Sequence, residues 1–346
     1  MNRSVLYALA AAALFGASTP FAKLLTGDMP PVLLAGLLYL GSGIGLTLVR
    51  LIRDGGLKTP GLPGNEWPWL LGAIFFGGVI GPVLLMFGLM STSGTTASLL
   101  LNLEAVLTAI IAWMVFKENA DRRIVWGMLA IVAGGVALGW PTDSPVQARF
   151  SGPVLVGLAC LCWAIDNNLT RKVSASDALF IAGIKGLIAG SVNTARALNM
   201  DAELPNIATL SATMAVGLMG YGISLVLFVL ALRGLGTART GAYFSTAPFL
   251  GAAVALFVFS ETTSLAFWIA AVLMGVGVCL HLSEHHVHEH LHEVVEHEHE
   301  HFHDEHHQHA HDLAGGESRN HSHPHTHIPI KHSHPHYPDI HHRHVH

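Results

Sequence analysis

The chain has 346 residues, of which 51% are hydrophobic and 12% are charged, and its mean hydropathy is +0.48. Soluble domains carry about 25% charged residues, so this composition excludes an ordinary soluble domain and predicts a membrane protein. The net charge of −5 is the sum over two segments of the chain with different compositions. Residues 1–280 hold 15 Lys/Arg and 12 Asp/Glu, whereas residues 281–346 hold 3 and 11 together with all 25 histidines.

Apolar segments long enough to cross a bilayer recur along the first four fifths of the chain. A bilayer core about 30 Å thick needs roughly 20 apolar residues in a helix, and backbone in lipid must bond to itself, which favours helices. The sequence therefore predicts an all-α membrane protein with ten transmembrane helices, near residues 4–25, 31–50, 68–89, 94–116, 122–140, 151–171, 177–197, 207–232, 238–260 and 263–282.

Basic residues orient these helices. With the N-terminus in the cytoplasm, eleven Lys/Arg fall at inner ends and loops and three fall at outer ends, which satisfies the positive-inside rule. An even number of spans returns the C-terminus to the cytoplasm. We expect a multi-pass protein of a bacterial-type plasma (inner) membrane with both termini cytoplasmic and no nucleic-acid partner.

The chain repeats itself weakly. Residues 94–118 align with residues 237–261 at an offset of 143, and "FGASTPFAK" (15–23) aligns with "WAIDNNLTR" (163–171) at an offset of 148. Five spans per unit is an odd number, so the second unit must enter the membrane inverted. Inverted repeats are typical of transporters whose substrate site lies near the bilayer midplane.

Both repeats resemble EamA domains of the drug/metabolite transporter superfamily. The resemblance rests on "SLLLNLEAVLTAIIAWMVFKE" (98–118), on "STAPFLGAAVALFVFSE" (245–261), and on the glycine pairs Gly134/Gly135 and Gly275/Gly277. It implies two five-helix repeats, residues 4–140 and 151–281, in a secondary transporter that exports metabolites or amino acids. Such repeats often carry a proline where span 4 or 9 narrows. Pro248 is present but its partner is Ala105, which predicts different helix geometry in the two halves.

Three ionisable residues lie well inside predicted spans: Glu104, Asp166 and Lys185. Such charges cost about 2.5–3.5 kcal/mol at the bilayer centre and usually face a bundle interior, so all three are expected to line one cavity. A carboxylate held away from water can take up and release a proton, which makes Glu104 a candidate coupling group. Lys185 would hold a substrate carboxylate or neutralise Glu104. A structural Glu–Lys or Asp–Lys pair is the alternative.

Amides and small residues complete the predicted interior. Asn102, Asn167 and Asn168 are candidates for hydrogen bonds to substrate, although amides also join helices. Glycines spaced four apart predict close helix packing: Gly41/Gly45, Gly77/Gly81 and Gly186/Gly190. We find no nucleophile–base pair and no phosphate-binding loop, so we expect no enzymatic activity and no required cofactor.

Residues 282–346 form a histidine-rich tail that we expect to be cytoplasmic and partly disordered. Residues 281–312 could continue the last span as a helix, since His281, His285, His288 and His292 follow helical spacing. Imidazole is a frequent ligand of divalent transition metals. We expect the tail to bind nickel, cobalt or zinc through His285, His288, His292, His297, His299, His301, His303, His321, His323, His325 and His327.

Three functions fit these patterns. The first is an exporter of a small polar metabolite or amino acid whose tail senses or buffers metal. The second is an exporter of nickel, cobalt or zinc, free or chelated, that the tail supplies; the lack of histidines before His281 argues against it. The third is a membrane-tethered metal buffer, against which the three deep charges argue.

Overall fold

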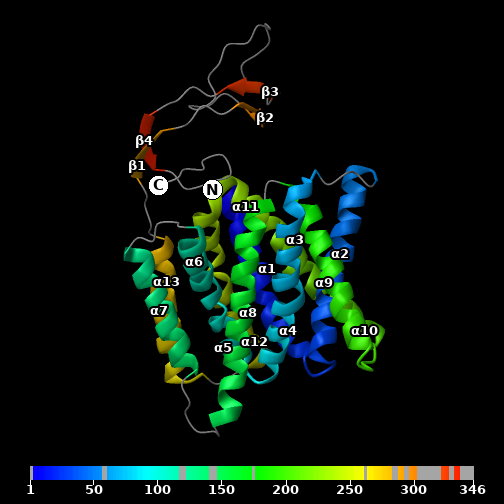
Figure 1. Cartoon of the computed structure of the whole chain (residues 1–346). Coiled ribbons are helices and arrows are strands. Elements are labelled where there is room, and N and C mark those ends of the chain that lie inside the picture. Colours follow the sequence, from blue (N-terminus) through cyan, green and yellow to red (C-terminus); the bar gives the residue numbers. More distant parts are fainter. Residues whose placement is uncertain are drawn as a thin grey trace. The chain divides into compact units, whose positions relative to one another are not determined.

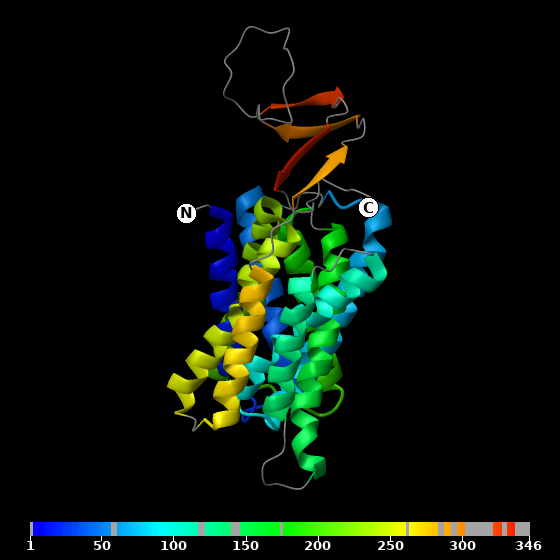
Figure 2. The same ribbon diagram turned by 90° about the vertical axis from the view of Figure 1, so that its left-hand side faces the viewer.

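The computed structural model describes residues 3–56, 61–116, 122–139, 146–173, 176–260 and 263–282, and four short strands between residues 287 and 335. Contacts divide the chain into two units, a helical unit that ends near Glu284 and a unit that contains the strands. The helical unit is a bundle whose helices run roughly alongside one another (Figures 1 and 2).

The first half of the helical unit contains α1 (Arg3–Leu25), α2 (Pro31–Asp54), η1 (Gly64–Glu66), α3 (Trp67–Ala73), η2 (Ile74–Ile80), α4 (Gly81–Met90), α5 (Gly94–Leu100), α6 (Leu103–Phe116) and α7 (Arg122–Gly139). The second half contains α8 (Val146–Val173), α9 (Ala178–Leu198), α10 (Ile207–Gly217), η3 (Leu218–Ile223), α11 (Ser224–Phe244), α12 (Ala247–Phe259) and α13 (Leu265–Leu282).

Seven helical runs are long and apolar enough to cross a membrane, by length and composition: Arg3–Leu25, Pro31–Asp54, Gly64–Met90, Gly94–Val115, Ser151–Val173, Ala178–Leu198 and Ile207–Ala231. Three shorter apolar helices accompany them: Val125–Leu138, Ala247–Phe259 and Leu265–Leu280. Large apolar side chains are exposed on the outside of the bundle, among them Val272 (65% exposed) and Phe257 (88%). Such a surface suits contact with lipid acyl chains rather than water.

Two predicted boundaries are wrong. Helical backbone continues through residues 233–237, where the sequence predicts a loop between two spans, and the helix breaks instead at Ser245–Thr246. The last helix ends at Leu282 and does not continue through residues 281–312, since strands begin at Val287 and Glu296.

The two halves run in opposite directions. In Figure 1, α1 begins at the upper end of the bundle and α8 begins at the lower end. Both halves contain a π-helical segment at equivalent positions, η2 and η3, and the repeat offset of 143 places Gly77 of η2 on Gly220 of η3. A π-segment leaves backbone carbonyls without helical partners and often marks a functional site. This arrangement is consistent with the inverted two-repeat architecture.

A break in the helix also recurs in both halves. It lies at Leu101–Asn102, between α5 and α6, and at Ser245–Thr246, between α11 and α12. Asn102 donates to the carbonyl of Leu99 (3.0 Å) and Ser245 donates to that of Gly241 (2.9 Å), so polar side chains satisfy backbone acceptors near each break. The break forms with Pro248 in the second half and without a proline at Ala105 in the first, so a proline is not required for it.

The most extensive helix contact in the described bundle joins α2 of the first half to α9 of the second. A Cβ on Gly186 would lie 2.5 Å from the nitrogen of Gly43 and 2.8 Å from the carbonyl of Tyr39. Real Cβ atoms do not approach so closely, so only glycine permits this crossing. Gly41 and Gly217 similarly face backbone of α10 and α2. The predicted packing role of Gly41 and Gly186 is therefore confirmed.

Asp177 joins the ends of α2 and α9. Its side chain accepts from the backbone N–H of Leu179 (3.0 Å), capping α9, and from Arg53 (2.6 Å) and Arg50 (3.2 Å) of α2. Partial burial raises the pKa of the Asp177 carboxyl, but the hydrogen bonds from Arg53 and Leu179 outweigh burial, and the net pKa lies below its ordinary value.

We expect Asp177→Ala to cost about 1–2 kcal/mol, because it removes both the helix cap and the charge pairs. Asp177→Asn, which can still cap the helix, should cost less. A carboxyl group whose pKa is lower in the folded than in the unfolded protein stabilises the fold at pH values above its unfolded-state pKa. That stabilisation is lost as the pH falls through the folded-state pKa. The difference in stability between Asp177→Ala and the parent should therefore be largest at neutral pH and narrow in acid, where only the contribution of the helix cap remains. Unfolding in detergent at several pH values measures this; an unchanged difference in acid would contradict it.

The strand-containing unit has two antiparallel ladders, with β1 (Val287–Leu291) against β4 (Lys331–Pro335) and β2 (Glu296–His301) against β3 (His321–Thr326). Of the eleven predicted metal ligands, His285, His292, His303 and His327 lie outside the described residues. The register places His288 opposite His334, and it pairs the other predicted positions as His297–His325, His299–His323 and His301–His321.

Candidate functional site

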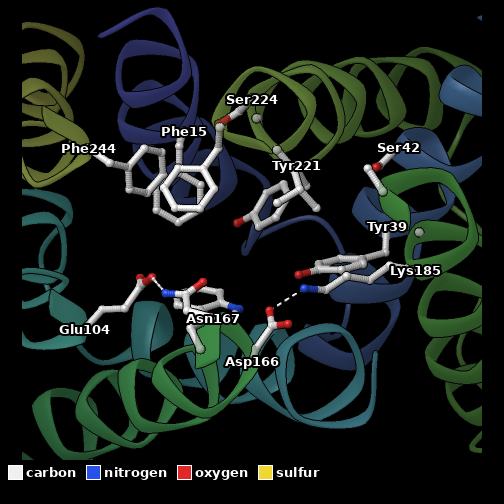
Figure 3. Close-up of a pocket in the computed structure, with 16 residues that line it drawn as sticks. Phe15, Tyr39, Ser42, Glu104, Asp166, Asn167, Lys185, Tyr221, Ser224 and Phe244 are labelled. Atoms are coloured by element: carbon white, nitrogen blue, oxygen red, sulfur yellow. Dashed lines mark hydrogen bonds and ion pairs between the residues drawn. The ribbon is translucent and has the colours of Figure 1, made fainter. Parts of the chain in front are cut away.

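A cavity of about 70 Å³ lies inside the helical unit (Figure 3). Its lining comes from both halves: α1, α2 and α6 of the first half contribute, as do α8, α9, η3 and α11 of the second. Among the predicted site residues, Glu104, Asp166, Asn167 and Lys185 line it. The structure thus brings together the three deep charges and one of the three predicted amides.

Lys185 of α9 forms an ion pair with Asp166 of α8, and both side chains are buried. Thr170, one turn along α8, donates to the other oxygen of Asp166 (2.9 Å). The Asp166 carboxylate therefore has a charged partner and a hydroxyl partner without any ligand. The sequence left open whether Lys185 neutralises Glu104 or pairs with Asp166, and the structure has the second arrangement.

Glu104 of α6 has a different environment. Its Oε1 accepts a hydrogen bond from the amide of Asn167 (2.8 Å). Among the ion pairs of the described residues, none includes Glu104. Figure 3 shows Glu104 and Asn167 at one side of the cavity and the Asp166–Lys185 pair at the other. The polar side of the cavity is thus a row of four residues, two of which neutralise each other.

Aromatic rings form the wall of the cavity opposite the polar row. The composition of the sequence did not predict that these aromatic residues belong to the site. Phe15 packs against Trp163 (centroids 5.9 Å apart), against Tyr221 (6.0 Å) and against Phe244 (5.3 Å), while Tyr39 packs against Tyr221 (5.3 Å). The repeat contained a usable signal, because the offset of 148 places Phe15 on Trp163. Residues that are equivalent in the two halves thus meet at the cavity.

The π-segment η2 is held by side chains that line or adjoin the cavity. The Gly77 carbonyl accepts from the Tyr39 hydroxyl (2.7 Å) and from the Trp163 indole (3.0 Å), and the Val79 carbonyl accepts from Asn193 (3.1 Å). A Cβ on Gly77 would overlap the Asp166 carboxylate. The missing side chain at Gly77 therefore lets Asp166 lie beside Lys185.

The other two predicted amides do not line the cavity. Asn102 donates to the Leu99 carbonyl, and Asn168 donates to the carbonyls of Ala164 (2.8 Å) and Thr108 (3.3 Å). These contacts stabilise helices and join α8 to α6, which is the packing role that amides commonly have in membranes. Across the part of the chain with described side chains, no three His, Cys, Asp or Glu residues come together.

Comparison with known proteins assigns the chain to a family. The model of the EamA-like transporter family matches residues 2–139 and 150–283. The chain belongs to the EamA-like transporter family. It is a multi-pass membrane protein whose family transports substrates across membranes, and the cavity lies at the contact of the two halves that the family model matches.

Curated relatives of this EamA-like protein are also transporters. An "Uncharacterized transporter" of Methanothermobacter thermautotrophicus is 28% identical over 280 residues, covering 76% of this chain and 81% of the relative. "Uncharacterized transporter YyaM" of Bacillus subtilis is 24% identical over 247 residues, covering 67% and 78%. A solved structure titled "Crystal structure of protein" has a TM-score of 0.63 at 20% identity, covering 81% of this chain and 95% of that one, and shares the fold.

Proposed function

We propose that this protein is a secondary active transporter that exports a small polar metabolite, amino acids included, through the cavity lined by Glu104, Asp166, Asn167 and Lys185. The observation that carries this proposal is the enclosure of three ionisable side chains between the two halves, where a membrane protein would otherwise avoid charge. The small cavity volume favours a small solute, because sites for drug-sized ligands enclose about 300–1,000 Å³.

The proposed topology has ten crossings, arranged as an inverted repeat pair at residues 4–140 and 151–281, with both termini in the cytoplasm of a bacterial-type inner membrane. The seven long runs, the three shorter apolar helices and the opposite directions of α1 and α8 support it. In such transporters one repeat rocks against the other around a central site. The glycine-mediated contact between α2 and α9 provides a close junction between the halves.

Glu104 is the proposed coupling group. It lines the cavity and has an amide partner instead of a cation. A carboxylate in this setting can bind a proton on one side of the membrane and release it on the other. Asp166 is less suited to this role, because Lys185 and Thr170 stabilise its charged form.

The histidine-rich tail, residues 282–346, is the proposed binding segment for nickel, cobalt or zinc. Alternating histidines on paired strands place imidazole-bearing positions opposite one another in register. We expect metal binding to fail below about pH 6, where imidazole becomes protonated and protons compete with the metal.

Metal export is the second candidate function, and the tail is the feature that favours it. The ion pair in the cavity favours the first function, since Lys185 already occupies the carboxylate that a divalent cation would need. A tethered metal buffer that transports nothing would leave the buried charges without a transport role.

One comparison separates these functions. Cells would carry the full chain, a chain cut after Leu282, or Glu104→Gln, and we would measure growth under nickel, cobalt or zinc stress and the secretion of metabolites. Glu203→Gln, at an exposed position outside the cavity, is the matched control.

We expect Glu104→Gln to lower secretion at least about tenfold, while truncation leaves secretion unchanged, since the tail is not in the transport path. Loss of metal resistance in both variants would instead favour metal export. Loss in the truncated chain alone, with normal secretion by Glu104→Gln, would favour a buffer.

A further inference from the structure

The hydroxyl of Tyr221 is buried and makes no hydrogen bond of ordinary geometry in the part of the chain that the structure describes. The neighbouring Ser18 hydroxyl interacts with it but donates its own hydrogen bond to the Phe15 carbonyl (2.6 Å). The residue is 7% exposed and lies in η3, between Phe15 and Tyr39. Tyr39, in contrast, donates to the Gly77 carbonyl. Leaving a buried hydroxyl without a partner costs about 1–3 kcal/mol. Figure 3 shows this hydroxyl pointing into the cavity, toward the row of polar residues.

The charges around the cavity do not balance. Its described lining contains two carboxylates, Glu104 and Asp166, and one ammonium group, Lys185. Asp166 and Lys185 neutralise each other. The ionised form of Glu104 therefore leaves one uncompensated negative charge in a region of low dielectric, where an isolated charge is costly.

The aromatic wall adds a second preference for positive charge. Phe15, Phe244 and Tyr221 present rings to the same space that Glu104 lines. The faces of aromatic rings attract cations within about 6 Å of their centroids. A cation between the carboxylate and these rings would interact favourably with both groups. Its N–H groups could donate to the hydroxyl oxygen of Tyr221, which lines the same cavity.

We propose that the cavity recognises a small monocationic amine, whose ammonium group pairs with Glu104 and donates a hydrogen bond to the Tyr221 hydroxyl while its apolar body lies on the aromatic wall. This inference rests on the proposed transport function and narrows its substrate class. A carboxylate on the ligand is not required. It is disfavoured, because Lys185 is the cationic side chain of the described lining and Asp166 already holds it.

Three probes with one apolar body test the charge preference: 3-methylbutylamine (cation), leucine (zwitterion) and 4-methylpentanoate (anion). Binding to the purified full chain in detergent at neutral pH is measured by calorimetry. We expect the amine to bind at least about tenfold more tightly than leucine, and the anion to bind least. Glu104→Gln should weaken amine binding about thirtyfold or more, and Tyr221→Phe about tenfold. Tyr243→Phe, outside the cavity lining, is the control.

Equal or tighter binding of leucine, or measurable preference for the anion, would overturn the amine assignment and leave transport intact. Unchanged amine affinity in Tyr221→Phe, with its unfolding midpoint also unchanged, would overturn the role of Tyr221. If none of the probes binds, the inference fails, whereas the secretion experiment with Glu104→Gln still decides the proposed function separately.

Discussion

Asp166→Asn and Lys185→Met should each destabilise the protein by about 3–5 kcal/mol, because each leaves one buried charge without its partner. The two side chains are only 6% and 5% exposed, so little water reaches the charge that is left unpaired. The double variant should recover most of the lost stability, since removing both charges also removes the unpaired one. Unfolding in mixed micelles with increasing SDS measures all four proteins.

The double variant also separates stability from transport. If the pair belongs to the transport site, the double variant should fold and fail to secrete substrate. A double variant that is as unstable as the single variants would show that the two charges do not stabilise each other. A stable double variant with normal secretion would make the pair a structural contact only.

Gly186→Ala should have the second large effect. Its new methyl group would lie 2.5 Å from the Gly43 nitrogen and 2.7 Å from the Gly43 Cα, which are backbone atoms that cannot rotate away. Overpacking costs about 1–3 kcal/mol and occasionally more, and we expect the upper end here. The helices α2 and α9 would have to separate, which would also widen the cavity that Gly186 lines.

Gly157→Ala is the matched control for this prediction. Gly157 lies in α8, and a Cβ there would meet no atom within 4 Å. The control should be neutral or more stable by up to about 1 kcal/mol, because alanine is the better helix former. Equal effects of the two substitutions on the SDS unfolding midpoint would contradict the close contact between α2 and α9.

The buried charges were predictable from the sequence, but their pairing was not. Glu104, Asp166 and Lys185 stand out because lipid tolerates ionisable groups only where protein or water surrounds them. Which carboxylate meets Lys185 depends on how α6 and α8 are rotated about their axes. That rotation follows from the break at Leu101–Asn102 and from the space that Gly77 leaves for Asp166, neither of which has a periodic signature.

Two other features were not predicted from the sequence: the aromatic wall of the cavity and the strands of the tail. Phe15 and Tyr221 are apolar or amphipathic residues in apolar helices, so no contrast with their neighbours distinguishes a cavity position from a lipid-facing one. Only the repeat offset, which equates Phe15 with Trp163, links Phe15 to the site, and no comparable signal marks Tyr221. In the tail, His281, His285, His288 and His292 fit a helix, but the alternating "HEHEH" pattern has the period of two that a strand requires. The strands β1 and β2 follow the second pattern.

Thiol labelling tests most directly whether the buried polar groups surround an aqueous cavity. In a background without Cys160, Cys162 and Cys279, single cysteines would replace Ser42 and Ser224, which line the cavity, or Val272, which is 65% exposed on the outside of the bundle. We predict that a membrane-impermeant, water-soluble thiol reagent modifies the cysteines at 42 and 224 from one side of the membrane and spares the cysteine at 272. Modification at 272 alone, with 42 and 224 unreactive from both sides, would contradict the account.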